Sequence, residues 1–240
     1  MAIVKNEARN ISEWIDHYFW QGAAHLFIID NGSGDSTVEI IKSHPRRSDI
    51  TIYMLPRPYR QVEHYRHVFL KEAISSRFQW LIIADADEFW FDKEGEGLPA
   101  ALQSREAFDL IYCNWTIFGT SGLEVHPTSL RKELTKCQPK LGPHEFTKWA
   151  VKTDAIRGRS AITVHKVAGC RSTHTISDNE RFQINHYFTQ SLEFWRDVKM
   201  RRGDVVDPAN DAARTLQMYH GTEAACVHQD DKLSSMVKAL

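Results

Sequence analysis

Residues 80–88, with the sequence WLIIADADE, decide the fold. The four apolar residues that open this stretch predict a β-strand that is buried on both faces. The strand leads directly into Asp85, Asp87 and Glu88. In a sheet of parallel strands flanked by helices, ligands bind outside the carboxyl ends of the strands. The stretch therefore predicts an α/β protein whose site lies at one edge of its sheet.

Three further strands are expected before this one, at residues 2–4, 26–29 and 51–55, with helical patterns between them. Strands that alternate with helices are typical of βαβ units and of a mainly parallel sheet. The first two strands also end in polar residues, KNEAR at 5–9 and DNGSGD at 30–35. Because the carboxyl ends of parallel strands meet at one edge, three polar clusters are expected to line a single crevice.

The spacing of apolar residues predicts a helix that begins after Asn10 and ends before Gly22. Asn10 and Glu13 match a capping box, in which each side chain would accept a bond from a backbone amide at the helix start. Asp35 is expected to cap a short second helix.

The second half of the chain is less regular. We expect strands at residues 108–115, 149–153, 161–167 and 182–188, a long loop region at 123–145, and a helix that begins at Ser191. The pattern indicates one α/β domain, residues 1–203, followed by a helical tail, residues 204–240.

Composition bounds the class of protein. The 240 residues suit one large domain, and 42% hydrophobic with 25% charged residues excludes a disordered or fibrous chain. A formal net charge of -1 argues against a general nucleic-acid binder. Four widely spaced cysteines indicate neither a disulfide scaffold nor a zinc ribbon, and they favour a reducing cytoplasm. No apolar run approaches the ~20 residues that a membrane span needs, and the first residues lack the apolar segment of a signal peptide.

Asp85 and Asp87 indicate a cation site. Alternate residues of an extended segment project to the same side, so the two carboxylates can converge on one ion, and oxygen ligands suit Mn²⁺ or Mg²⁺. A solvated acidic turn is the alternative, which the preceding apolar run disfavours. The glycines at 32 and 34 do not make a dinucleotide-binding loop, because Thr37 replaces the third glycine, and the chain has no P-loop motif.

Short motifs occur in a fixed order along the chain: VKNE at 4–7, EW at 13–14, IDNGSGDS at 29–36, QVEHY at 61–65, ADADEF at 84–89, FGTSG at 118–122 and INHYFTQS at 184–191. In this order they resemble the motifs of the family-2-like and family-92-like glycosyltransferases. The resemblance spans about residues 3–203. It implies a GT-A fold, in which a nucleotide-sugar donor lies across the strand ends of a Rossmann-like, mainly parallel sheet, with an irregular second half on the acceptor side.

The resemblance also implies a donor pocket. Asp30 would receive the nucleobase. The other donor-pocket positions would be Asn6, Glu7, Gln61 and Tyr65.

The implied metal and phosphate ligands come from three parts of the chain. Asp85 and Asp87 would hold Mn²⁺ or Mg²⁺ at the donor diphosphate, with His186 as a further ligand of the metal or the diphosphate. The segment KMRRG at 199–203 is similar to a late K-x-x-R-G pattern, so Lys199 and Arg202 would hold the diphosphate. Cations at a helix end are also favourable for dipole reasons alone.

The catalytic base and the acceptor contacts are less defined. The acidic pair that family-2 enzymes often carry in their second half is not recognisable here. Acids and histidines that could serve as the base are Asp154, Asp178, Glu180, Glu145 and His165. Trp115 could stack on an acceptor sugar, and it leads into the loop that contains Ser121. Trp90 and Trp149 could also stack, although large aromatic residues near strands more often belong to the core.

The leading hypothesis is a metal-dependent transferase that moves a sugar from a nucleoside diphosphate, by resemblance UDP, to a carbohydrate or glycolipid acceptor with inversion. No nucleic-acid partner is expected, and the expected location is the cytoplasm, with peripheral association at the inner face of a membrane as an option. One alternative is a nucleotide-sugar or carbohydrate-binding protein without turnover. A less favoured one is a haloacid-dehalogenase-type phosphohydrolase with Asp85 as its nucleophile.

Overall fold

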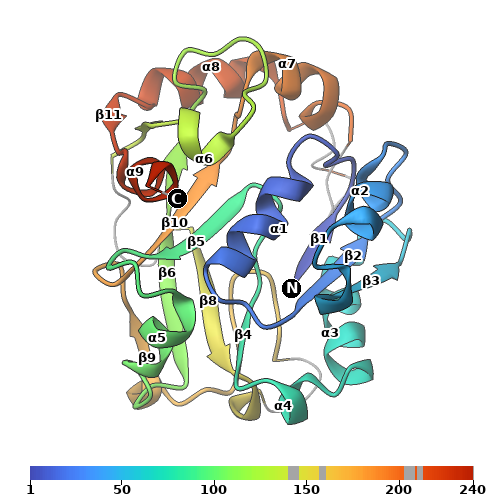
Figure 1. Ribbon diagram of the computed structural model, residues 1–240, viewed down its shortest axis with the longest axis vertical. Coiled ribbons are helices and arrows are strands. Elements are labelled where there is room, and N and C mark those ends of the chain that lie inside the picture. Colours follow the sequence, from blue (N-terminus) through green and yellow to red (C-terminus); the bar gives the residue numbers. More distant parts are fainter. Residues whose placement is uncertain (140–145, 157–160, 203–208, 210–212, 240) are drawn as a thin grey trace.

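The structure is a computed structural model that describes residues 1–139, 146–156, 161–202, 209 and 213–239. Its first part is a parallel sheet of β1 (Ala2–Val4), β2 (Leu26–Asp30) and β3 (Ile50–Met54) in the order β1-β2-β3. Between and after these strands lie the helices α1 (Ile11–Trp20), α2 (Thr37–Ser43), α3 (Gln61–Lys71) and α4 (Ile74–Arg77), with a short 3-10 turn at Arg47–Asp49. The predicted α/β class, a parallel sheet flanked by helices, is confirmed (Figure 1).

The second sheet is mixed. Its strands are β4 (Trp80–Ile82), β5 (Glu88–Asp92), β6 (Leu110–Phe118), β7 (Lys136–Cys137), β8 (Thr147–Lys152), β9 (Thr175–Ser177), β10 (Phe182–Tyr187) and β11 (His228–Gln229). β6 is its centre, because it pairs in parallel with β10 and β9 and antiparallel with β8. β4 pairs antiparallel with β8, and on its other side Ala84 N donates to Met1 O. The apolar strand of residues 80–83 therefore joins the two sheets.

The remaining helices are α5 (Leu98–Gln103), α6 (Leu130–Glu133), α7 (Leu192–Phe194), α8 (Leu216–Ala225) and α9 (Lys232–Lys238), with 3-10 turns at Thr153–Ala155 and Ser172–His174 and a π-helical turn at Trp195–Lys199. α6, α7, α8 and α9 gather at the top of Figure 1. α8 is fixed to the end of β6, because the Glu223 carboxylate accepts bonds from Thr120 N and from the hydroxyls of Thr120 and Thr189. Among the described residues, no helix is both long and apolar enough to cross a bilayer.

Local sequence signals gave one helix cap correctly, since Phe194 N donates to Ser191 Oγ at the start of α7. At α2 the capping position is Ser36, and Asp35, one residue earlier, accepts a bond from Thr37 N. Gly22, with a φ of 90°, follows the end of α1 as expected.

Three local predictions are wrong. The region 123–145, which was expected to be a long loop, contains α6 and β7. Asn10 does not cap α1 through its side chain, because that amide bonds Glu7 and Gln190, and the Glu13 carboxylate instead accepts bonds from the start of α6. Residues 161–167 do not form a strand. They make a tight turn, in which Thr163 N donates to Lys166 O and Lys166 N donates to the Thr163 hydroxyl.

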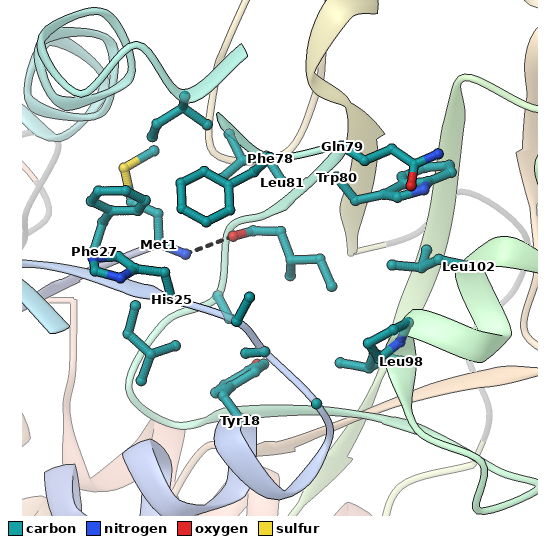
Figure 2. A pocket seen from close by; sticks show the side chains of 18 of the residues that line it. Met1, Tyr18, His25, Phe27, Phe78, Gln79, Trp80, Leu81, Leu98 and Leu102 are labelled. Carbon is teal, nitrogen blue, oxygen red and sulfur yellow. Dashed lines mark hydrogen bonds between the residues drawn. The ribbon is translucent and has the colours of Figure 1, made fainter. Parts of the chain in front are cut away.

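An apolar cavity of about 340 Å³ lies at the amino ends of β1, β2 and β4. Figure 2 shows Tyr18, Phe78, Trp80, Leu98 and Leu102 around it, and the Met1 amine donating to Ile82 O at 2.7 Å. The carboxylates of residues 85–88 follow the opposite end of β4.

α1 packs on β5 through a buried histidine. His17 is fully buried, its Nε2 is 2.6 Å from Trp90 O, and its ring meets the Phe89 ring edge-on at 5.0 Å. Because a carbonyl only accepts, Nε2 carries the proton. Burial, and secondarily the charge of Arg131, lowers the pKa of His17 to about 3, so the imidazole is neutral in the folded protein.

We expect acid to destabilise the protein through His17. Below the ordinary pKa of 6.5 the unfolded chain binds a proton that the folded chain rejects down to about pH 3, so stability present above pH 6.5 falls as the pH drops. Between pH 7 and pH 5 this amounts to ~2 kcal/mol, at ~1.4 kcal/mol per pH unit. Urea unfolding should be measured at pH 7 and at pH 5. The free energy of unfolding should fall between these pH values by ~2 kcal/mol less in His17→Gln than in the wild type. The exposed His228→Gln should behave as the wild type, and equal losses in all three proteins would contradict the prediction.

Candidate functional site

A cavity of about 550 Å³ opens at the carboxyl ends of β1 and β4. It brings together residues from eight separate parts of the chain. Those that the sequence pointed to are Glu7, Gln61, Asp85, Asp87, Trp115, His165, His186, Lys199 and Arg202. The cavity thus lies at the predicted edge of the sheet, and the clusters after β1 and β4 line it, whereas residues 30–35, which were expected there too, do not.

Asp85 is held by a lysine from β8. Lys148 Nζ donates to Asp85 Oδ2 at 2.8 Å and lies 3.5 Å from Glu88 Oε1. Glu88 Oε2 in turn accepts a bond from Asp85 N at 3.0 Å. The Lys148 side chain is fully buried, and these two carboxyl groups are the acids that it contacts there. Sequence reasoning missed Lys148, although a lysine directly before the apolar run WAV of a strand is a signal that could have found it.

Asp87 is held by a lysine from the π-helical turn after α7. Lys199 Nζ is 2.5 Å from Asp87 Oδ2 and 2.5 Å from Phe188 O, to both of which it donates. The same Asp87 oxygen lies 3.5 Å from His186 Nε2, at the end of β10. The predicted group of Asp87, His186 and Lys199 is therefore assembled at one point.

These pairings set the charges at the site. For Asp85 burial raises the pKa, but the charge and the hydrogen bond of Lys148, together with the charge of His186, lower it on balance. The pKa of Asp87 is held well below its usual range because Lys199 and His186 outweigh burial. Burial raises the pKa of Glu88 well above its usual range despite Lys148. Asp85 and Asp87 are therefore anions, whereas Glu88 is the carboxyl that holds a proton most readily.

Arg202 is positioned by the end of β1. It donates to Lys5 O at 3.2 Å and to Glu7 Oε1, and Asn10 Nδ2 donates to the other oxygen of Glu7 at 2.9 Å. The neighbouring carboxylates outweigh burial and raise the pKa of Arg202, so it remains a cation that lines the cavity. Glu7, which was expected to contact the donor, holds Arg202.

Three of the donor-pocket residues do not line the cavity. Tyr65 is fully buried and its hydroxyl accepts a bond from Gln61 Nε2 at 3.3 Å. Asn6 Oδ1 accepts a bond from Gly34 N, which ties the end of β1 to the loop after β2. Asp30 is fully buried and accepts bonds from the amides of residues 32 and 33. Of this set, Gln61 and Glu7 reach the cavity.

Trp115 and His165 form one wall of the cavity. The Trp115 ring lies 4.3 Å from the His186 ring and 5.5 Å from the His165 ring, and it stacks on Phe146 with a 7° interplanar angle. His165 lies on the turn of residues 163–166, where its Nδ1 is 3.0 Å from Thr147 O.

Other candidates are used elsewhere. Ser121 Oγ accepts bonds from the amides of residues 135 and 136, so it orders the loop after β6. Trp90 and Trp149 are fully buried in the core, as the alternative interpretation held.

The two aspartates proposed as the base lie away from the cavity. Asp178 accepts a bond from Arg105 at 2.8 Å and from the amides of residues 180 and 181, so Glu180 is beside it. Asp154 lies in a turn whose Thr153 N donates to Gln79 O, at the amino end of β4. Neither lines the cavity, and we do not retain them or Glu180 as catalytic candidates. Glu145 and Gly203 lie outside the described residues.

The metal-ligating side chains at this site suit a divalent ion that also binds phosphate. In the part of the chain that the structure describes, no group of three His, Cys, Asp or Glu residues could hold a metal by itself. Asp87 and His186 nevertheless converge, and Mg²⁺ or Mn²⁺ at phosphate sites commonly takes one or two protein ligands and fills its other positions with phosphate and water. A carboxylate with an imidazole suits Mn²⁺ better than the oxygen-preferring Mg²⁺.

The comparison with protein families decides the identity. The model for glycosyltransferase family 92 matches residues 1–219. The chain belongs to glycosyltransferase family 92. A family 92 protein of Oryza sativa subsp. japonica is 26% identical over 201 residues, covering 82% of this chain and 34% of its own length. One of Ricinus communis is 26% identical over 211 residues, covering 84% and 37%. The chain thus spans about a third of the length of these curated relatives.

Solved structures resemble this family 92 chain distantly. S. aureus TarS, residues 1–349, superposes with a TM-score of 0.46 and 16% identity, covering 92% of this chain and 70% of that one. Glucosyl-3-phosphoglycerate synthase from Mycobacterium tuberculosis gives 0.39 and 13%, covering 74% and 68%.

We expect Lys148 to be essential for stability. Lys148→Met leaves Asp85 and Glu88 without their buried cation, so the free energy of unfolding should fall by ~3–5 kcal/mol in urea titrations. Lys152→Met, in the same strand but at its partly exposed end, should cost under ~1 kcal/mol. Adding Glu88→Gln to Lys148→Met should recover part of the loss. Equal losses for the two lysines would show that the buried ammonium is not needed.

Proposed function

We propose that the protein is a glycosyltransferase that moves a sugar from a nucleotide-sugar donor, UDP-linked by family resemblance, to a carbohydrate or glycolipid acceptor. The observation that carries this proposal is that acidic and basic side chains meet in one cavity. Asp85, Asp87 and His186 line it, and Lys199 and Arg202 bring cations to the same space. A diphosphate needs such cations, and membership of family 92 supports the sugar as the transferred group.

Asp87 and His186 would hold a divalent ion, and the ion when bound would offset the charge of the leaving diphosphate. Lys199 and Arg202 would act on the same charge from the protein side, since fixed cations in a water-poor site stabilise developing negative charge strongly. Glu7 would keep Arg202 in place. Asp85, already neutralised by Lys148, would accept bonds from donor hydroxyls.

His165 is the base that we propose for a single displacement with inversion. Thr147 O can only accept, so Nδ1 carries the proton and Nε2 is left as an acceptor. Desolvation lowers the pKa of His165, and the charge of Lys148 lowers it further, so the ring is neutral at pH 7. The acceptor hydroxyl would give its proton to Nε2 while its oxygen bonds the anomeric carbon, and the bond to the diphosphate breaks. Trp115, beside His165, would face the sugars.

The first test is nucleotide binding. We expect UDP with Mn²⁺ to raise the melting temperature, because a ligand at 100 times its Kd adds ~2.7 kcal/mol to stability. Asp87→Asn should lose the response to the metal, and Arg202→Met should lose most of the response to UDP. Arg201→Met is the matched control, since Arg201 is exposed and lies one residue away, and it should respond as the wild type does.

Turnover separates the proposal from a binding protein. With Mn²⁺ and a panel of sugar nucleotides, the enzyme should release the nucleoside diphosphate, and faster with an acceptor present. Binding without release from any donor or acceptor would favour the alternative of a non-catalytic protein. Phosphate transferred to Asp85 would favour the phosphohydrolase.

His165→Gln should lower kcat by about 10²–10⁴-fold, the usual contribution of a general base, while leaving UDP binding intact. In the wild type, the rate should fall at acid pH as the imidazole becomes protonated below its ordinary pKa. Steady-state rates across pH 5–8 should show this acidic limb in the wild type and not in the variant. A variant with an unchanged kcat would assign the base elsewhere.

A further inference from the structure

The ammonium of Lys199 lies where the metal ligands meet. It is 2.5 Å from Asp87 Oδ2, the oxygen that is also 3.5 Å from His186 Nε2. A second bond from the ammonium to Phe188 O, at 2.5 Å, fixes it there, and the side chain is only 2% exposed. The carboxylate that would bind a metal is thus already neutralised by the protein.

A divalent ion and this ammonium compete for one oxygen. Mg²⁺ binds carboxylate oxygen at about 2.0–2.1 Å, so an ion on Asp87 Oδ2 would be within a few ångström of the Lys199 nitrogen. Like charges that close repel strongly in a buried site. A metal that binds Asp87 Oδ2 together with His186 must therefore displace the ammonium.

The two lysines of the site differ in their freedom to move. Lys148 bonds two carboxylates inside the sheet and does not line the cavity, so it has no other anion to reach. Lys199 lines the cavity beside Arg202, at the end of a π-helical turn. When a diphosphate enters, its oxygens provide a second anion for Lys199 beside the Asp87 carboxylate.

We propose that Lys199 is a built-in counter-ion that occupies the metal position in the unliganded protein and transfers to the donor phosphates when metal and donor bind. This inference rests on the proposed function. It makes the binding of metal and of diphosphate cooperative. The metal frees the Lys199 ammonium from Asp87, and the diphosphate gives that ammonium a new anion. Such coupling is reciprocal, so UDP must raise metal affinity by the factor by which metal raises UDP affinity.

The test measures Mn²⁺ binding without nucleotide, by the loss of the free Mn²⁺ resonance signal. Lys199→Met should bind Mn²⁺ about tenfold more tightly than the wild type. In the wild type, saturating UDP should tighten Mn²⁺ binding at least tenfold, and in Lys199→Met this gain should shrink. Lys166→Met is the control, since Lys166 lines the same cavity without a bond to Asp87, and it should change Mn²⁺ affinity less than threefold.

Several outcomes would overturn the inference. One is unchanged or weaker Mn²⁺ binding by Lys199→Met, and another is an equal gain in Lys166→Met. A third is a wild type whose Mn²⁺ affinity changes neither with UDP nor with inorganic pyrophosphate. Lys199→Gln, which can keep the bond to Phe188 O, serves if the methionine variant does not fold, and the wild-type measurement decides without any variant. The comparison of Mn²⁺ binding by the wild type and Lys199→Met contains no nucleotide. It can therefore support the role of Lys199 even if no sugar transfer is found, and sugar transfer can be found even if this comparison shows no difference.

Discussion

Two aspartates separated by one residue must both stay ionised at the end of a nearly buried strand, and the rest of the site follows from that constraint. A buried carboxylate is costly unless a cation and hydrogen bonds compensate it. The fold supplies one lysine for each, Lys148 from β8 to Asp85 and Lys199 from the turn after α7 to Asp87. The mixed sheet is what makes this possible, because β8 runs antiparallel beside β4 and carries its lysine to the acidic end of that strand.

The local pattern of residues 80–88 and the polar strand ends were enough to predict the α/β class and the edge where the cavity lies. Strand periodicity and the rule for parallel sheets act over short distances in sequence, so they can be read directly. Lys148 is 63 residues from Asp85, and the sequence around Lys148 does not indicate which acid it contacts. That sequence does show a charge within a largely apolar strand, which requires an opposite charge somewhere in the fold.

The incorrect predictions have two physical causes, one in tertiary contacts and one in a local turn. Asn10 and Glu13 have the spacing of a capping box, yet tertiary contacts with Glu7 and with the start of α6 take both side chains. Residues 161–167 are rich in β-branched side chains, but the Thr163 hydroxyl closes a turn with Lys166. That turn is what brings His165 to the cavity wall, so the loss of a strand there serves the site.

The π-helical turn after α7 links the length of that segment to the position of the Lys199 ammonium. Met200 N bonds to Trp195 O, five residues back, so the turn contains one residue more than an α-helical turn. The wider turn takes up that residue, so Lys199 reaches Asp87 along a path that is one residue longer than an α-helix would need between the same two points. The position of the ammonium therefore depends on the number of residues in this turn as well as on the lysine itself.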